Sequence, residues 1–337
     1  MALLRLSIIC TLIIFMQTGF ADKAVGSPLI ETNWLAENLD NVVVLDILLN
    51  DKNFTTPPKF KTDDNLTLVK MGGHIPGARL IFYKNVRGDR IIDGKTIKHM
   101  VITVNQFEKL LQKAGVNQND HIVITTNAES AFDLTMATRM FWQVKYFGHN
   151  EVSLLNGGTS QWLIDGHKAS TTLNKHTQGN WKSKSIDSSI IADSEETMSA
   201  SIDSNIQLVD VRPLGQYLGS FKSGKAKTKG HIPTAKVFPV DLLSTRKSPI
   251  KFLSEDELKL LSNALNISPE TPLITYCNSG HMASGAWFAF HEILRNKNTK
   301  LYDGSMHQWT HENRPVVSMV LEQASNNYHQ EGFIDIA

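Results

Sequence analysis

The stretch Leu273-Ile274-Thr275-Tyr276-Cys277-Asn278-Ser279-Gly280-His281-Met282-Ala283-Ser284 decides the fold and the chemistry of this chain. Its first four residues are β-prone and follow a proline, and a helical apolar run begins at Ala283, so the stretch predicts a strand, a loop and a buried helix. Cys277 stands where the strand ends. There, loop N–H groups and the helix dipole point at the sulfur and favour the reactive thiolate. A buried structural cysteine is the alternative.

The N-terminal 21 residues have the pattern of a secretory signal peptide. Arg5 precedes an apolar run at 6–16 that is too short to span a bilayer, and small residues allow cleavage after Ala21. We therefore expect an exported protein, periplasmic or secreted, with no membrane segment after cleavage. An uncleaved N-terminal anchor is the alternative. Cleavage removes Cys10, which leaves Cys277 as the one thiol and allows no intrachain disulfide.

Composition limits the classes of partner. The chain has 34 basic and 33 acidic residues, and loss of Arg5 with the signal makes the two counts equal. A chain without net charge gives no support for binding nucleic acid or an anionic membrane. The histidines are scattered and one thiol remains, so we expect neither a metal site nor another cofactor. With 337 residues, of which 41% are hydrophobic, the chain can form about two globular domains.

One ordered set of features occurs twice in the chain. Each copy has a short apolar strand, a Gly-His-Ile-Pro turn, an amphipathic stretch, a second strand, a helical stretch, and a closing strand with a tryptophan after it. These are residues 42–46, 73–76, 106–114, 121–125, 131–141 and 154–162 in the first copy, and 207–212, 230–233, 255–265, 273–276, 283–294 and 301–309 in the second. Strands that alternate with helices predict an α/β protein with parallel sheets, whose sites lie at the carboxyl ends of strands.

The repeat resembles the tandem-domain rhodanese sulfurtransferases. The matching motifs are Asp-x-Arg at 210–212, His-Ile-Pro-x-Ala in both copies, the six-residue loop 277–282, and Asp303-Gly304-Ser305 with Trp309 after it. The resemblance covers nearly all of residues 30–315. It implies two rhodanese-like domains, each a parallel sheet with helices on both faces.

The resemblance also divides the chain. We place an inactive rhodanese-like domain at 27–167, a connector at 168–205, a catalytic rhodanese-like domain at 206–316 and a C-terminal tail at 317–337. The second domain carries the nucleophile Cys277. Thr126 stands where the first domain would need its cysteine, and a hydroxyl group cannot carry persulfide sulfur.

The implied activity is sulfur transfer. The Cys277 thiolate would take sulfane sulfur from a small anionic donor, thiosulfate or 3-mercaptopyruvate, and pass it from a persulfide to cyanide or a thiol acceptor. The rest of the loop would line the substrate site: Asn278, Ser279, Gly280, His281 and Met282. We expect a monomer. A non-catalytic sulfur-carrier or binding protein of the same fold is the alternative.

The donor site departs from the family pattern. Thiosulfate-using members have basic residues in the loop, whereas this chain has Asn278 and Ser279, and Gln216 replaces an arginine that is common in the family. An anionic donor still needs a cation, for which Arg212 and Lys225 are the candidates. The alternatives are a structural ion pair at the strand end for Arg212 and a solvated loop for Lys225.

The loop also has features of the mercaptopyruvate-using members, whose loop serine pairs with a histidine and an aspartate of the first domain. Ser279, His74 and Asp63 occupy matching positions and would form a proton relay. The alternative for His74 is a backbone hydrogen bond that fixes the Ile-Pro turn. His281 could pair with the thiolate or respond to pH. A phosphatase or arsenate reductase is excluded, because such enzymes need arginine where this loop is followed by Ala283.

Overall fold

The computed structural model describes residues 27–62, 66–203 and 205–320. The predicted signal peptide at 1–21, Asp63, and most of the predicted tail lie outside the described residues. Within the described ranges, no helix combines the length and the apolar character that crossing a bilayer requires.

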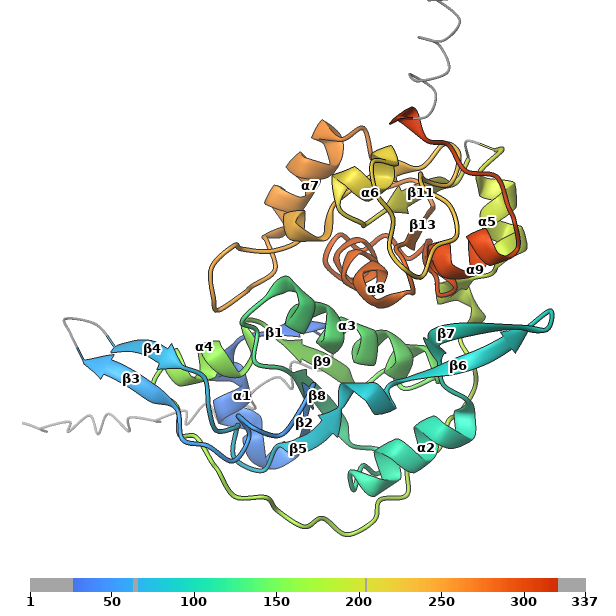
Figure 1. Cartoon of the computed structure of the whole chain (residues 1–337). Coiled ribbons are helices and arrows are strands. Elements are labelled where there is room, and N and C mark those ends of the chain that lie inside the picture. The colour runs from blue at the N-terminus through green and yellow to red at the C-terminus, as the bar shows by residue number, and fades with distance from the viewer. Residues whose placement is uncertain (1–26, 63–65, 204, 321–337) are drawn as a thin grey trace, which may run out of the picture.

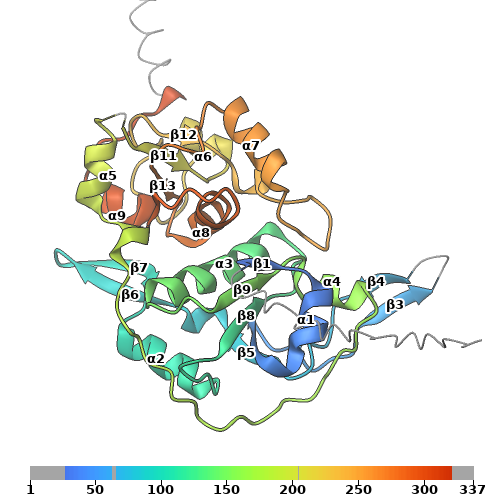
Figure 2. The ribbon, with the colours of Figure 1, turned by 180° about the vertical axis from the view of Figure 1, so that it is seen from behind.

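Two α/β domains of the same design make up the described chain, which confirms the predicted fold (Figures 1 and 2). The first contains β1 (Leu29–Ile30), α1 (Thr32–Asn38), β2 (Val42–Leu48), β3 (Lys59–Thr62), β4 (Leu66–Lys70), β5 (Arg79–Phe82), β6 (Arg87–Ile92), β7 (Lys95–Val101), α2 (Val104–Lys113), β8 (His121–Thr125), α3 (Ala131–Tyr146), β9 (Val152–Leu155) and α4 (Gly158–Ile164). The second contains β10 (Ile191–Ala192), α5 (Ser194–Ala200), β11 (Gln207–Asp210), α6 (Leu214–Leu218), β12 (Lys236–Val237), α7 (Glu255–Ala264), β13 (Leu273–Tyr276), α8 (His281–Phe288), β14 (Thr299–Tyr302) and α9 (Ser305–His311).

Each domain is built on a five-stranded parallel sheet. The strand orders are β1-β9-β8-β2-β5 and β10-β14-β13-β11-β12, so the two sheets have the same topology. The central strands are nearly continuous apolar runs because helices cover both faces of a parallel sheet. The two predicted amphipathic stretches form α2 and α7, and each begins at a capping box, Thr103 with Gln106 and Ser254 with Glu257.

The second domain begins inside the range that we predicted as a connector, 168–205. Strand β10 pairs with β14 in parallel, and α5 follows it. These two elements are the counterparts of β1 and α1 in the first domain. The remaining connector runs along the outside of the first domain (Figure 1). It is anchored there by Trp181, which is buried against Phe107 and whose amide donates to the Val116 carbonyl over 3.1 Å.

The domains meet where α3 packs on α8 (Figures 1 and 2). Gly285 allows this close approach, because a β-carbon there would lie 2.8 Å from Cγ2 of Thr135. Each domain also sends a segment to the other. The β6–β7 hairpin brings the Val101 amide to Asp303 Oδ2 over 2.7 Å, and the second domain brings the Phe252 amide to Asn156 Oδ1 over 3.2 Å. The repeat therefore forms an approximately two-fold symmetric pair.

The histidine of each Gly-His-Ile-Pro turn makes the same contacts. The His74 ring stacks on Phe54 at 3.6 Å, and its Nδ1 is hydrogen-bonded to the Phe54 carbonyl at 2.8 Å. His231 stacks on Tyr217 at 3.9 Å, with its Nδ1 2.7 Å from the Tyr217 carbonyl. The shared geometry gives both histidines a structural role in fixing the turn.

Candidate active site

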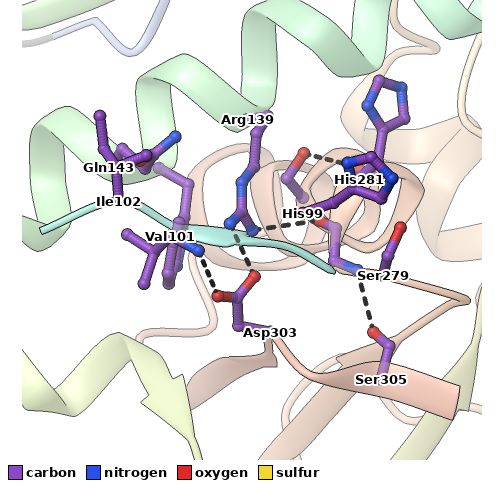
Figure 3. A network of polar contacts seen from close by, with 12 residues as sticks. His99, Val101, Ile102, Arg139, Gln143, Ser279, His281, Asp303 and Ser305 are labelled. Carbon is purple, nitrogen blue, oxygen red and sulfur yellow. Dashed lines mark hydrogen bonds and ion pairs between the residues drawn. The ribbon is translucent and has the colours of Figure 1, made fainter. Parts of the chain in front are cut away.

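The loop that carries Cys277 lies between β13 and α8 and is shaped by Ser305. The Ser305 hydroxyl accepts from the amides of Cys277 and Gly280, each over 3.1 Å, and donates to the Tyr302 carbonyl over 2.9 Å. The first turn of α9 adds a bond from the Met306 amide to the Cys277 carbonyl over 3.1 Å. Figure 3 shows Ser305 beneath the loop. These bonds make the loop a rigid support for the thiol.

Gly280 is required by two features of this loop. Its φ of +70° lies in the left-handed region, where side chains other than glycine are strained. A β-carbon there would also lie 2.5 Å from Oδ1 of Asp303 and 2.8 Å from Nη1 of Arg139. The loop therefore turns closely over a buried charge pair.

The sulfur of Cys277 lies in a buried setting. Cys277 is only 1% exposed. The amides of Cys277 and Gly280 donate to Ser305, and the sulfur accepts no hydrogen bond within the described ranges. The amides of Asn278, Ser279, His281 and Met282 remain as candidate main-chain donors, and nearby cations add to the electrostatic surroundings of the sulfur.

Four cationic side chains lie around the loop: Arg87, Arg139, Arg212 and Lys225. Two of them are neutralised. Nη2 of Arg212 is 2.5 Å from Oδ2 of Asp210 and donates to the Gly230 carbonyl over 2.8 Å, which is the structural ion pair considered as the alternative for Arg212. Nη2 of Arg139 is 2.6 Å from Oδ1 of Asp303, in the pair that Figure 3 shows.

Lys225 lies at the loop. Its Nζ donates to the Ser279 hydroxyl over 3.1 Å, and burial together with the Arg87 charge lowers its pKa, while the charge of Cys277 acts in the opposite direction. The preceding loop residue, Asn278, donates through its side-chain amide to Gln216 Oε1 over 2.9 Å. The structure thus brings three sequence-predicted residues together: Lys225, Ser279 and Cys277.

The first-domain members of the predicted relay lie differently. His74 is fully buried in its turn, and its backbone amide donates to the Ser170 carbonyl over 2.8 Å. Burial lowers the pKa of its ring. No hydrogen bond among the described residues joins His74 to Ser279, and Asp63 is not among those residues. The hydroxyl of Ser279 is hydrogen-bonded to Lys225 instead.

His281 connects the loop to the first domain. Its Nδ1 is hydrogen-bonded to the Tyr83 hydroxyl, its Nε2 lies 2.7 Å from Oγ1 of Thr135, and its ring stacks on Phe132. Burial and the charges of Arg87 and Arg139 hold its pKa well below the usual range. A neutral ring with both nitrogens occupied does not supply the ion pair with the thiolate that the sequence suggested. Its loop neighbour Met282 packs against the apolar core.

Several residues of the first domain at this site carry no sequence motif that could have revealed them. Arg87 and His99 belong to the β6–β7 hairpin, and Tyr83 and Arg139 precede and follow it. His99 has a φ of +66°, and its pKa is lowered by burial and then by the charges of Arg87 and Lys225. Figure 3 places His99 in the same network as Ser279 and His281. The site is therefore assembled from both domains.

The first domain has a loop at 126–130, between β8 and α3, that corresponds to the Cys277 loop. Among the described residues, this degenerate loop keeps the backbone arrangement but lacks the cations found around Cys277. The Thr159 amide donates to the Thr126 carbonyl over 2.8 Å, as Met306 does to Cys277. Asp46 is the counterpart of Asp210, but Leu48 replaces the arginine. Both Asp46 carboxyl oxygens are buried without a hydrogen bond, and burial together with Asp133 raises the pKa of Asp46 to about 7.

Comparison with known proteins identifies the family. A family model described as the rhodanese-like domain matches residues 31–165 and 194–312. The chain belongs to the rhodanese-like family. Both structural domains are matched, which confirms the resemblance drawn from the ordered motifs.

The relatives cover most of the chain. "Putative thiosulfate sulfurtransferase" of Saccharopolyspora erythraea is 29% identical over 290 residues, 84% of this chain and 92% of the relative. "Sulfur carrier protein TtuD" of Thermus thermophilus is 27% identical over 302 residues, 86% and 95% respectively. The crystal structure of the 3-mercaptopyruvate sulfotransferase SseA from Escherichia coli matches with a TM-score of 0.65. The match has 23% sequence identity, covers 83% of this chain and 98% of SseA, and shows that the two proteins share a fold.

Proposed function

We propose that this rhodanese-like chain is a sulfurtransferase that moves sulfane sulfur from a small anionic donor to a thiophilic acceptor through a Cys277 persulfide. The observation that carries the proposal is a thiol at the carboxyl end of β13 beside two cations, Lys225 and Arg87, that form no ion pair within the described ranges. The names of the relatives support the same activity.

The proposed reaction has two steps. The Cys277 thiolate attacks the outer sulfur of thiosulfate, the S–S bond breaks, and sulfite leaves with the electron pair. With 3-mercaptopyruvate the C–S bond breaks instead, and the enolate of pyruvate leaves and takes a proton. The acceptor then attacks the outer sulfur of the persulfide, which releases thiocyanate when the acceptor is cyanide and regenerates the thiolate.

The surroundings of the thiol favour this chemistry. Attraction between an anion and a cation is stronger at a buried site than in water, so Lys225 and Arg87 stabilise the thiolate and the persulfide. The Ser279 hydroxyl, hydrogen-bonded to the Lys225 ammonium, can pass a proton to a departing enolate. We propose this pair as the proton source for 3-mercaptopyruvate, in the place first considered for His74 and Asp63.

A sulfur-carrier role is the second candidate. It is favoured by the burial of Cys277 at 1% exposure, which means that side chains must move before a donor reaches the sulfur. The likeness to a protein named as a sulfur carrier supports it as well. A carrier would accept and release one sulfur atom per chain without rapid turnover.

Steady-state assays with thiosulfate and 3-mercaptopyruvate, with cyanide as acceptor, separate the two candidates. We expect many turnovers and, after donor alone, an intact mass increased by one sulfur atom on Cys277. The variant Cys277→Ser should lose turnover with both donors and show no added sulfur. Retained turnover in Cys277→Ser would refute the enzyme assignment, and a single stoichiometric transfer by the unaltered chain would identify a carrier.

We also propose that the protein is exported after removal of residues 1–21, on the pattern of the N-terminal sequence. The measurement is the N-terminal sequence of the full-length protein expressed in a cell with a secretion pathway. Export predicts a mature chain that begins at Asp22. A chain that retains its first residues in the membrane fraction would identify an anchor instead.

A further inference from the structure

We propose that Arg87, from the first domain, is the specificity-determining cation of the donor site and holds the oxyanion of the donor together with Lys225 of the second domain. The proposal rests on the function proposed for Cys277 and deepens it. It explains how a loop with neutral Asn278 and Ser279, and with Gln216 in place of an arginine, can still bind an anion.

The fold brings Arg87 to the loop. Arg87 begins β6, and its guanidinium carbon lies 4.4 Å from the ring centroid of Tyr83, whose hydroxyl is hydrogen-bonded to His281. Arg87 pairs with Val101 in the hairpin, and the Val101 amide donates to Asp303 over 2.7 Å. The backbone and the side chain of Arg87 are therefore both tied to elements that support the catalytic loop.

The Arg87 guanidinium is available for a ligand. Within the described ranges it forms no ion pair, and its buried Nε has no hydrogen-bond partner. A buried N–H group without an acceptor is costly, and an anion in the site would supply the acceptor. Arg139 and Arg212 cannot take this role, because Asp303 and Asp210 neutralise them at 2.6 Å and 2.5 Å.

The charges around Arg87 point to an anionic occupant. The positive charge of Arg87 interacts with the sulfur of Cys277 and with the ammonium of Lys225. Arg87 also interacts with Asp303, but that carboxylate is already paired with Arg139 at 2.6 Å. Arg87 and Lys225 therefore repel each other in a partly buried site, and an anion between them reduces that repulsion. The planar fork of arginine matches a carboxylate or another small oxyanion. The donor class is therefore a small oxyanion with a transferable sulfur atom, bound between the domains.

Kinetics of Arg87 variants test the role in donor binding. We expect Arg87→Gln to raise the KM for the anionic donor at least tenfold with a smaller change in kcat, and Arg87→Lys to recover part of the loss. The matched control is Lys84→Gln, which removes an exposed charge three residues earlier and should change KM less than twofold. Comparison of thiosulfate with 3-mercaptopyruvate shows which oxyanion Arg87 favours.

Two kinetic results would overturn the proposal. One is a KM for Arg87→Gln within twofold of that of Lys84→Gln. The other is an equal loss of kcat and thermal stability in Arg87→Gln and Arg87→Lys with no change in KM, which would mean that Arg87 only supports the fold.

An alkylation assay tests the anion site without relying on sulfur transfer. Iodoacetate is an anion and iodoacetamide is neutral, and the two reagents are similar in size, so the ratio of their rates at Cys277 reports the field of nearby cations. We expect Arg87→Gln to lower this ratio at least threefold, Arg87→Lys and Lys84→Gln to preserve it, and added salt to reduce it in the unaltered protein.

The outcomes of this assay separate the two proposals. An unchanged ratio in Arg87→Gln, or a thiol that neither reagent labels, would overturn the role of Arg87 even if sulfur transfer were established. A ratio that falls as expected in a protein that transfers sulfur from neither donor would support the anion site and refute the proposed activity.

Discussion

Replacement of Arg139 by methionine should destabilise the protein strongly, because it breaks a buried ion pair between the domains. The side chains of Arg139 and Asp303 are 0% and 2% exposed, and their charged atoms are 2.6 Å apart. Without Arg139, the Asp303 carboxylate keeps the Val101 amide at 2.7 Å as a partner and interacts with the charge of Arg87, but it loses its paired counter-charge. Removing one member of such a pair costs about 3–5 kcal/mol.

Thermal unfolding gives the measurement. For 337 residues the unfolding entropy is about 0.7 kcal/mol/K, so each 1 kcal/mol lowers Tm by about 1.4 °C and Arg139→Met should lower it by about 4–7 °C. The matched control is Arg246→Met, since Arg246 pairs with Asp241 at 2.9 Å but is 76% exposed. An exposed pair contributes about 0–1 kcal/mol, so the control should shift Tm by less than about 1.5 °C. Equal shifts in the two variants would refute the argument from burial.

A second variant separates charge from packing. Arg139 also lies 4.8 Å from the ring centroid of Trp142, so its loss removes contacts as well as a charge. The double variant Arg139→Met/Asp303→Asn carries no unpaired carboxylate at this position and should recover part of the lost stability. If the double variant is no more stable than Arg139→Met, lost packing rather than the uncompensated charge explains the effect.

Two further predictions concern the first domain. Burial raises the pKa of Asp46 from 3.8 to about 7, so the folded state favours the protonated carboxyl. This contribution to stability is present at low pH and is lost as the pH rises through 7. Asp46→Asn should therefore raise the free energy of unfolding by about 2–4 kcal/mol at pH 8 and change it little at pH 4. Urea unfolding at both pH values checks this, and an equal gain at pH 4 would exclude the carboxylate charge as the cause. The double variant Thr126→Cys/Cys277→Ser moves the thiol to the loop of the first domain. It should show no turnover in the cyanide assay, because the acidic residues Glu129 and Asp133 lie in and just after this loop where cations would be needed. Measurable turnover would contradict the electrostatic argument.

Local sequence patterns predicted the backbone of both domains and the position of the thiol. Alternating apolar strands and helical stretches identify parallel sheets, because strand burial and helix periodicity are properties of neighbouring residues. The paired motifs showed that the design occurs twice. The ion pair of Asp210 and Arg212, two residues apart, could also be considered from the sequence, since both lie at the end of one strand.

The composition of the site was decided by tertiary structure. Arg87, Tyr83, His99 and Arg139 reach the Cys277 loop only because α3 docks on α8 and the β6–β7 hairpin crosses to the second domain. No local pattern marks these residues, because contacts across a domain interface depend on how two finished surfaces pack. For the same reason the sequence placed Ser279 beside His74, whereas the folded chain places it beside Lys225. Sequence order thus identified the thiol for which a reaction is proposed, and domain packing determined which charges surround it.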